Sequence, residues 1–306
     1  MGLLSLLAAL FAQHAWPPAA RSPVLAFYGR LALSTANRLD AGDRNSGVFA
    51  WFVLVAAVLL PLGLASLLAA TLHSTLLMAL DAVVIYWSIG FLRTTGALAA
   101  IEKALRAGDP RAAAQHLAEW RGESLSTEDP GSLARLAIEQ GLREAHHGTF
   151  APLFWFLVLP GPAGLVLYPL AHRAARLWAE GPDPGERDFG WFAASAFHVL
   201  DWIPSRVSAF FFAVVGDFED ALYCWRAQAA QWLVPGEGIV LASGAGALGV
   251  RLGEPVSLGE HALDRPPLGI GETASDDALA SLEGLLWRTL VLWLIVFLLA
   301  AALALA

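Results

Sequence analysis

Long stretches without charged residues are the dominant pattern along this chain. Residues 48–72 are 25 consecutive positions without a charge, and about 20 apolar residues of helix are enough to cross the hydrocarbon core of a membrane. Residues 75–92 carry a single acid, Asp81, and residues 285–306 carry only Arg288, close to their start. The pattern therefore predicts three transmembrane helices.

Three weaker apolar stretches cover residues 1–16, 150–171 and 189–216. The first lacks the basic start and the small-residue cleavage site of a signal peptide, which predicts a retained helix. The other two contain prolines, in "LPGPAG" (159–164) and "DWIPSR" (201–206), where a helix must kink or stop. Within a membrane such breaks require protein or a water-filled cavity around the freed backbone groups, so an ordinary kink and a cavity are both open. We expect an all-α polytopic membrane protein with about 4–6 transmembrane or re-entrant helices.

Polar residues gather in three segments between these stretches, at 17–47, 93–149 and 217–284. Segment 93–149 has apolar residues at helical spacing, interrupted by Gly-Asp-Pro, and predicts a helical hairpin. Segment 217–284 begins as a polar helix and then becomes rich in Gly and Pro, with 11 acids against three arginines. We expect mainly loop there, within a single membrane domain over 1–306.

The basic residues of the polar segments predict their side of the membrane. Two predicted spans separate each polar segment from the next, so all three face one side. The first two segments hold four and seven Lys or Arg residues, and positively charged loops stay in the cytoplasm. Arg173, Arg176 and Arg187 would lie outside unless one broken segment is re-entrant. The pattern favours a multi-pass protein of the bacterial inner membrane with cytoplasmic polar loops.

Composition agrees with a membrane location and excludes some functions. The chain is 57% hydrophobic and 15% charged, with a mean hydropathy of +0.57, which predicts the lipid bilayer as its surroundings. A net charge of −8 and 19 scattered basic residues argue against a nucleic-acid partner. The lone Cys224 excludes an internal disulfide and a multi-cysteine metal site. The sequence leaves a homo-oligomer open.

Gly244, Gly246 and Gly249 have the G-x-G-x-x-G spacing of a dinucleotide-binding fold. That fold requires a strand before the glycines, a helix after them and a parallel sheet around them. Only about 30 residues follow Gly253 before the last predicted span, so no βαβ unit fits. We expect these small residues to let helices pack closely, as they do in other membrane proteins.

Several motifs, in order, resemble the CobD/CbiB/AmpE superfamily. "APLFWFLVLPGPAGLVLYPLAHRA" (151–174) is similar to its Ala-Pro-Leu-Phe span, and "LDWIPSRVSAFFFAVVG" (200–216) to its Pro-x-Arg signature, in AmpE as well. "SGAGALGVRLG", "GEHALDRPPLGIG", Asp276-Asp277 and the closing apolar helix resemble the C-terminal part of CobD/CbiB proteins. The positions that carry the structural part of the resemblance are Pro152, Asp201, Trp202, Pro204, Gly246, Gly249 and Gly253.

The resemblance implies two competing functions. CobD/CbiB proteins are assigned the attachment of an aminopropanol or its phosphate to adenosylcobyric acid, which forms an amide on a corrinoid side chain. A protein of this kind would take the corrinoid and aminopropanol phosphate as substrates, and acids would serve metal, nucleotide or general-base chemistry. The sequence does not name a cofactor. The alternative is an AmpE-type, non-catalytic modulator of β-lactamase induction or of the cell envelope.

The resemblance also selects candidate catalytic residues. Glu139 matches a family glutamate, Arg206 follows Pro204, and Arg265 stands in place of a family lysine beside two matching acids. The alternatives are ordinary: Arg206 snorkels to the interface, and the two acids are solvated. The candidates are Glu139, Glu144, His147, Arg206, Glu260 and Asp264.

Three departures from the family pattern argue against an unchanged active site. Glu144 and His147 replace an Asn and an Asp, the family's Gly-Arg-Asp motif is absent from "EWRGESLSTEDPGSL", and Phe197-His198 replaces an acidic pair.

Four ionisable residues suggest two further hypotheses, a metal site at His146 and His147 and a functional ionisable group within the membrane at Asp81 and His198. Adjacent histidines such as His146 and His147 point about 100° apart on a helix, so a metal would require a third ligand. Asp81 and His198 lie within apolar runs, where a charge costs about 2.5–3.5 kcal/mol at the helix centre.

Overall fold

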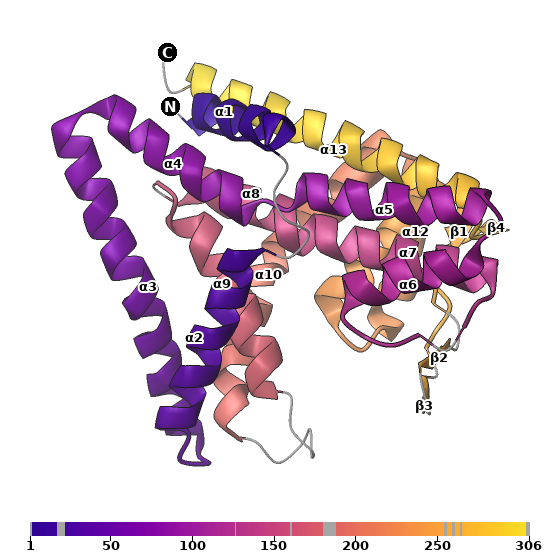
Figure 1. The fold of residues 1–306 in the computed structure, drawn as a ribbon, viewed down its shortest axis with the longest axis horizontal. Helices are drawn as coiled ribbons and strands as arrows, with labels where there is room; N and C mark the ends of the chain where they lie inside the picture. The colour runs from indigo at the N-terminus through magenta and orange to yellow at the C-terminus, as the bar shows by residue number, and fades with distance from the viewer. Residues whose placement is uncertain are drawn as a thin grey trace. The chain divides into compact units, whose positions relative to one another are not determined.

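The computed structural model describes residues 2–16, 22–125, 127–159, 161–179, 188–253, 256–258, 261–263 and 265–303, and it is almost entirely helical (Figure 1). Contacts within the chain divide it into two compact units. Unit 1 comprises Met1–Gly90, Ala151–Ile203 and Ile295–Ala306, and unit 2 comprises Phe91–Phe150 and Pro204–Leu294. The all-α fold is confirmed, and the single-domain organisation stays a prediction.

Unit 1 is built from long apolar helices that pack through small residues and a few polar contacts. α1 lies on α4, where Ser5 Oγ donates to the Met78 carbonyl at 3.2 Å. The Trp178 indole of α9 donates to the Ala32 carbonyl of α2 at 3.0 Å. A side chain at Gly47 would meet the backbone carbonyl of Phe189, so glycine permits a close approach there. The helices are α1 (Gly2–Ala15), α2 (Pro23–Leu39), α3 (Arg44–Leu72), α4 (Ser74–Ser88), α8 (Ala151–Val158), α9 (Ala163–Ala179) and the first part of α10 (Asp188–Val215).

Unit 2 combines shorter amphipathic helices with two small strand pairs. Its elements are α5 (Phe91–Arg106), α6 (Pro110–Arg121), α7 (Pro130–Ala145), the π-helix η1 (His146–Phe150), the second part of α10 from Pro204 onward, α11 (Phe218–Gln228), the 3₁₀ turn η2 (Ala229–Gln231), α12 (Pro235–Leu248), β1 (Val250–Arg251), β2 (Val256–Leu258), β3 (His261–Leu263), β4 (Glu272–Thr273) and most of α13 (Asp276–Leu303). β1 pairs with β4 in parallel, and β2 pairs with β3 antiparallel. The described residues form no βαβ unit.

Local chemistry sets the helix ends of segment 93–149. The predicted stop and restart is confirmed: α5 ends at Arg106, Gly108 adopts a φ of 71°, and α6 begins at Pro110 behind Asp109, whose side chain accepts the Ala112 N–H. The segment also holds α7, a third helix that a simple hairpin does not include.

The Gly- and Pro-rich part of segment 217–284 was expected to be mainly loop, with small residues at 242–249 that let a helix pack closely. Residues 235–248 form helix α12, which packs along α11. A Cβ at Gly246 would lie 2.7 Å from the Ala221 Cα of α11, and Gly249 ends the helix in the left-handed conformation. Almost all of α12 is buried, so its sequence lacks the polar face by which an amphipathic helix is recognised. The expectation of close helix packing is confirmed for Gly244 and Gly246, whereas a Cβ at Gly249 would meet no atom within 4 Å.

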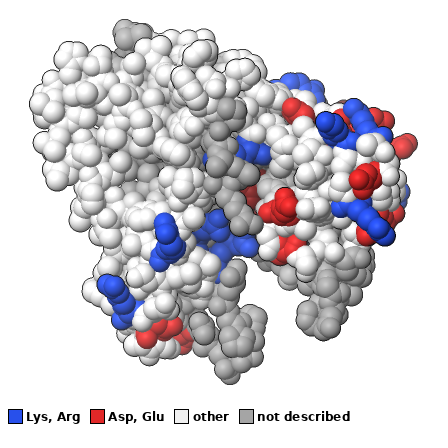
Figure 2. Space-filling view, viewed as in Figure 1, with Lys and Arg blue, Asp and Glu red and all other residues white. Residues whose placement is uncertain are grey.

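Among the described residues, four helical stretches are long and apolar enough to cross a membrane: Arg44–Leu72, Ser74–Arg106 (α4 followed by α5), Asp188–Val215 and Asp276–Leu303. The first two contain the predicted spans 48–72 and 75–92, and the fourth covers the predicted span 285–306 as far as Leu303. Large apolar side chains such as Leu60 and Leu64 of α3 are exposed, as expected of a lipid-facing surface. Around α4 the visible surface is uncharged, whereas acidic and basic side chains intersperse around α5 and α6 (Figure 2).

The two proline-containing breaks have different outcomes. "LPGPAG" does separate α8 from α9, and stretch 150–171 is not among the four span-length helices. "DWIPSR" does not stop the helix, because α10 continues through Pro204 from Asp188 to Val215. A proline removes one backbone hydrogen bond, which surrounding packing offsets inside a long helix.

Candidate functional site

A buried carboxylate lies at the centre of the polar network of unit 2. Glu139, on α7, is completely buried. Its Oε1 accepts the backbone N–H of Gly253 at 3.0 Å, and its Oε2 accepts Arg265 Nη1 at 2.6 Å. Arg265 Nη2 lies 3.4 Å from both Glu139 Oε1 and the Gly253 carbonyl oxygen. One carboxylate thus binds two residues that flank the β2–β3 hairpin.

Further charges surround this carboxylate within unit 2. Arg143, one helical turn after Glu139, has its Nη2 at 3.9 Å from Glu139 Oε2 and donates through Nε to Glu237 on α12 at 3.1 Å. The Arg265 guanidinium lies 5.6 Å from the centre of the Trp232 ring, in cation–π contact. Two arginines therefore stabilise the buried negative charge of Glu139, and the Trp232 ring stabilises the Arg265 cation.

A second polar clamp holds the chain just after Arg265. The Gln228 side chain, at the end of α11, accepts the Gly269 N–H at 2.6 Å and donates to the Gly269 carbonyl at 3.2 Å. Leu252 and Leu268 exchange backbone hydrogen bonds of 2.7 and 2.9 Å between them. The chain segments before and after the hairpin are thereby joined to each other and to α11.

The π-helix η1 carries the two histidines. His146 is buried, and its Nδ1 lies 2.9 Å from Ser208 Oγ of α10. Ser243 of α12 donates to the Ala209 carbonyl at 2.7 Å, beside this pair. Pro152 follows directly, and a proline ring clashes with the carbonyl four residues earlier in a regular α-helix, which the wider π-turn relieves. π-turns often mark functional sites, so His146 and His147 belong to the candidate site.

Motif residues of unit 1 form a polar and aromatic group within that unit. The Tyr168 hydroxyl of α9 donates to Asp201 Oδ1 on α10 at 2.7 Å, and both residues are buried. The Phe197 ring stacks on His172, with centroids 4.8 Å apart, and tilts against Tyr168 at 5.4 Å. Trp202 is 52% exposed. Asp201 therefore joins two helices, while Trp202 faces outward.

The structure places the other predicted residues as follows. Glu144 is half-buried and accepts a hydrogen bond from Gln140 at 3.2 Å. His147 is buried and its ring centroid lies 4.7 Å from that of His146, whereas Arg206 is half-buried. Of the predicted site residues that the structure describes, it brings Glu139 and Gly253 into direct contact. Glu260 and Asp264 lie outside the described residues.

Of four further predicted positions, three are buried and one is exposed. Pro152 and Pro204 are buried. Asp81 is 5% exposed, and its Oδ1 has no hydrogen-bond partner among the described residues, while His198 is exposed on α10.

Sequence reasoning missed some residues of the network. Arg265 was noted only as a substitute for a family lysine, and Gln228, Glu237 and Ser208 were not singled out. The four-residue spacing of Arg143 from Glu139 was an available signal, because side chains at i and i+4 meet on one helix face. Gln228 and Ser208 had no local signal.

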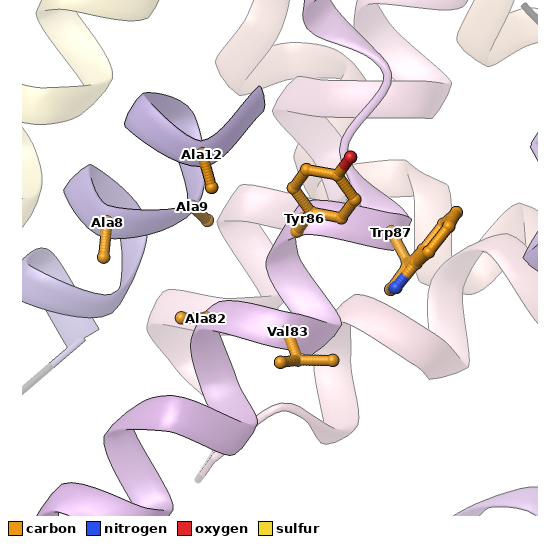
Figure 3. Close-up of a pocket in the computed structure, with 7 residues that line it drawn as sticks. All are labelled: Ala8, Ala9, Ala12, Ala82, Val83, Tyr86 and Trp87. Atoms are coloured by element: carbon orange, nitrogen blue, oxygen red, sulfur yellow. The ribbon is translucent and has the colours of Figure 1, made fainter. Parts of the chain in front are cut away.

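Unit 1 also contains an apolar groove between α1 and α4. It measures about 160 Å³ and is lined by alanines of α1 and by Ala82, Val83, Tyr86 and Trp87 of α4 (Figure 3). No predicted site residue lines it, and its lining offers no acid, base or metal ligand.

Fold and polar network together define an all-α membrane protein with span-length helices and buried charge clusters. The chain belongs to the CobD/CbiB family: the family described as "CobD/Cbib protein" matches residues 5–304. It is 34% identical over 300 residues to the "Cobalamin biosynthesis protein CobD" of Stutzerimonas stutzeri, covering 96% of each chain. It is 35% identical over 221 residues to the protein of that name from Chromobacterium violaceum, covering 72% of this chain and 70% of the relative. No solved structure matches the chain.

Proposed function

We propose that this protein acts in cobalamin biosynthesis as a multi-pass protein of the bacterial inner membrane. Its proposed reaction resembles that of an adenosylcobinamide-phosphate synthase, with a corrinoid carboxyl and an aminopropanol or its phosphate as substrates. The observation that carries the proposal is the match to a CobD protein at 34% identity over 96% of both chains, since a likeness of that extent includes the loops as well as the spans.

The proposed chemistry makes one amide bond. The amine nitrogen bonds to the corrinoid carboxyl carbon, one carboxyl oxygen leaves as water or on an activating group, and the amine gives up a proton. A base near neutral pKa and a group that binds the carboxyl are therefore required. Within unit 2, Glu144 and His147 on the α7–η1 segment stand where the family pattern has Asn and Asp, so in this chain they are the proposed, less effective substitutes for the family's proton-handling residues. Arg206 is the proposed carboxylate-binding cation.

One observation favours the second candidate, a non-catalytic AmpE-type role. Phe197 occupies a position where the family pattern has an acid, and its ring packs on His172 and Tyr168 in an aromatic cluster. An aromatic ring fixed in this way cannot supply the missing carboxylate. Together with Glu144 and His147 in place of Asn and Asp, this supports a weakened or disarmed site.

Growth of a bacterial strain that lacks its own CobD/CbiB protein tests the proposal. We expect weak rescue by the unmodified chain, because loss of one positioned acid or base lowers a rate roughly 10²–10⁴-fold. The double variant Glu144→Asn/His147→Asp restores the family pattern and should strengthen rescue. Arg206→Glu should abolish it while the protein stays in the membrane.

The control variant is Glu128→Gln, which alters a solvent-exposed ion pair with Arg111. It should rescue as well as its parent, since exposed pairs contribute little to stability. Absence of rescue by both the unmodified chain and the double variant, with both present in the membrane, would transfer the proposal to the AmpE-type role.

A further inference from the structure

We propose that Glu139 is a positioning residue that anchors the base of the β2–β3 hairpin on α7, and that it does not act as a general base. This inference deepens the proposed function, on which its catalytic part rests. The anchoring itself follows from the contacts of Glu139, Arg265, Gly253 and Gln228 within unit 2.

The Glu139 carboxylate is already engaged by other groups of the protein. Both oxygens already accept hydrogen bonds, Oε1 from the Gly253 N–H and Oε2 from Arg265 Nη1. The side chain has no exposed surface. A general base must come within about 3.2 Å of the proton that it removes. A carboxylate covered by a guanidinium and a backbone amide does not offer that access.

The two partners of Glu139 lie on either side of the β2–β3 hairpin in the sequence. Gly253 and Arg265 are 12 residues apart and bind the same carboxylate, and Arg265 Nη2 also reaches the Gly253 carbonyl at 3.4 Å. The β2–β3 hairpin, Val256–Leu258 paired with His261–Leu263, lies between them in the chain. Glu139 therefore closes the loop that contains the hairpin, and loop closure must be offset by such contacts.

The chain segments before and after the hairpin come close together at Gly253. Gly253 has a φ of 74°, and a side chain there would meet the Pro266 carbonyl oxygen. The two chain segments thus approach each other at a position that glycine alone accommodates. The Leu252–Leu268 bridge lies one residue before Gly253 and three residues after Arg265, and the Gln228 clamp holds Gly269, four residues after Arg265.

The sequence between Gly253 and Arg265 connects the anchor to the proposed reaction. Glu260 and Asp264, which match the family's acidic pattern, fall between Gly253 and Arg265 in the sequence. Glu139 fixes the two described residues that bound this stretch of sequence, Gly253 and Arg265. Loss of the anchor should therefore weaken substrate binding more than the chemical step, which is the behaviour of a positioning residue.

Limited proteolysis of the full-length protein in detergent measures the anchoring without any substrate. Glutamyl endopeptidase has one favourable site in this segment, Glu260–His261, because Glu254 precedes a proline. We expect Glu139→Gln to raise the cleavage rate at Glu260 at least tenfold, because its amide N–H₂ opposes the Arg265 guanidinium and leaves that charge buried and unpaired. Glu128→Gln is the matched control and should cleave at the parental rate.

Two more variants separate anchoring from general destabilisation. Gln228→Ala removes only neutral hydrogen bonds and should raise cleavage about two- to tenfold. Arg265→Lys keeps the positive charge but loses the second donor nitrogen of the planar guanidinium. Its cleavage rate should lie between those of the parent and Glu139→Gln. Each variant is first required to elute like the parent in size-exclusion chromatography. If Glu139→Gln fails this requirement, Gln228→Ala and Arg265→Lys still decide the question.

The growth assay then identifies the role of Glu139 in the reaction. In the best-rescuing background, Glu139→Gln, Arg265→Ala and Gln228→Ala should each weaken growth, and a larger supply of the corrinoid precursor should restore part of it. Parental cleavage rates in all anchor variants would overturn the inference. So would loss of growth in Glu139→Gln alone, at every precursor concentration. If no background supports growth, the proposed function fails, while the proteolysis rates still test the anchor.

Discussion

One chemical change, Gly→Ala, should have graded effects on stability at three helical positions, because these positions differ in how closely other parts of the chain approach them. At Gly246 the new methyl would lie 2.7 Å from the Ala221 Cα, and backbone cannot yield easily. At Gly244 it would lie 2.6 Å from a methyl at the end of the Leu142 side chain, which can rotate away. At Gly96 on α5 the new methyl meets no atom within 4 Å.

Two opposing terms set the magnitudes. Alanine is favoured over glycine in a helix interior by roughly 0.5–1 kcal/mol. Overpacking costs about 1–3 kcal/mol, with the upper end where backbone atoms obstruct. The net change in the free energy of unfolding is therefore about 2 kcal/mol destabilising for Gly246→Ala, near zero for Gly244→Ala, and about 0.5–1 kcal/mol stabilising for Gly96→Ala.

Thermal denaturation of the detergent-solubilised protein, followed by the fraction that stays monodisperse, measures the order. At about 2–4 °C per kcal/mol, Gly246→Ala should melt about 4–8 °C below the parent, and Gly96→Ala slightly above it. Adding NAD should shift none of these midpoints. A Gly246→Ala midpoint equal to that of Gly96→Ala would refute the packing of α12 on α11, and saturable NAD binding lost in Gly246→Ala would refute the packing role of the glycines.

Two further predictions concern thiol chemistry. Burial raises the pKa of Cys224 to about 11, so the folded protein should resist maleimide labelling at pH 7–8, where the thiolate is scarce, and should react after denaturation; rapid labelling of the folded protein would contradict the burial of this thiol. A cysteine at Ser126, a position outside the described residues, in a Cys224→Ala background should be shielded from impermeant thiol reagents in intact spheroplasts, because the basic residues of 93–149 predict a cytoplasmic location; ready labelling from outside would reverse the predicted orientation.

The sequence by itself determined the features that depend on local chemistry. The span at 48–72 follows from the absence of charge, because a chain in lipid must satisfy its backbone within a helix. The break between α5 and α6 follows from Gly108 and Pro110, which end and start a helix in any context. Family membership could also be predicted from the sequence, because several family motifs are present in the family's order although other motif positions have changed.

Tertiary structure decided the features that depend on distant neighbours. The bounds of helix 235–248 could not be predicted from a polar pattern, because a helix buried on nearly all sides has no polar face, and this helix packs along α11. Pro204 read as a break, yet the surrounding packing keeps α10 continuous. Glu139 and Arg265 are 126 residues apart, and no local pattern pairs them. Only the folded chain brings these two charges out of water together, and a buried charge is tolerated only beside such a partner.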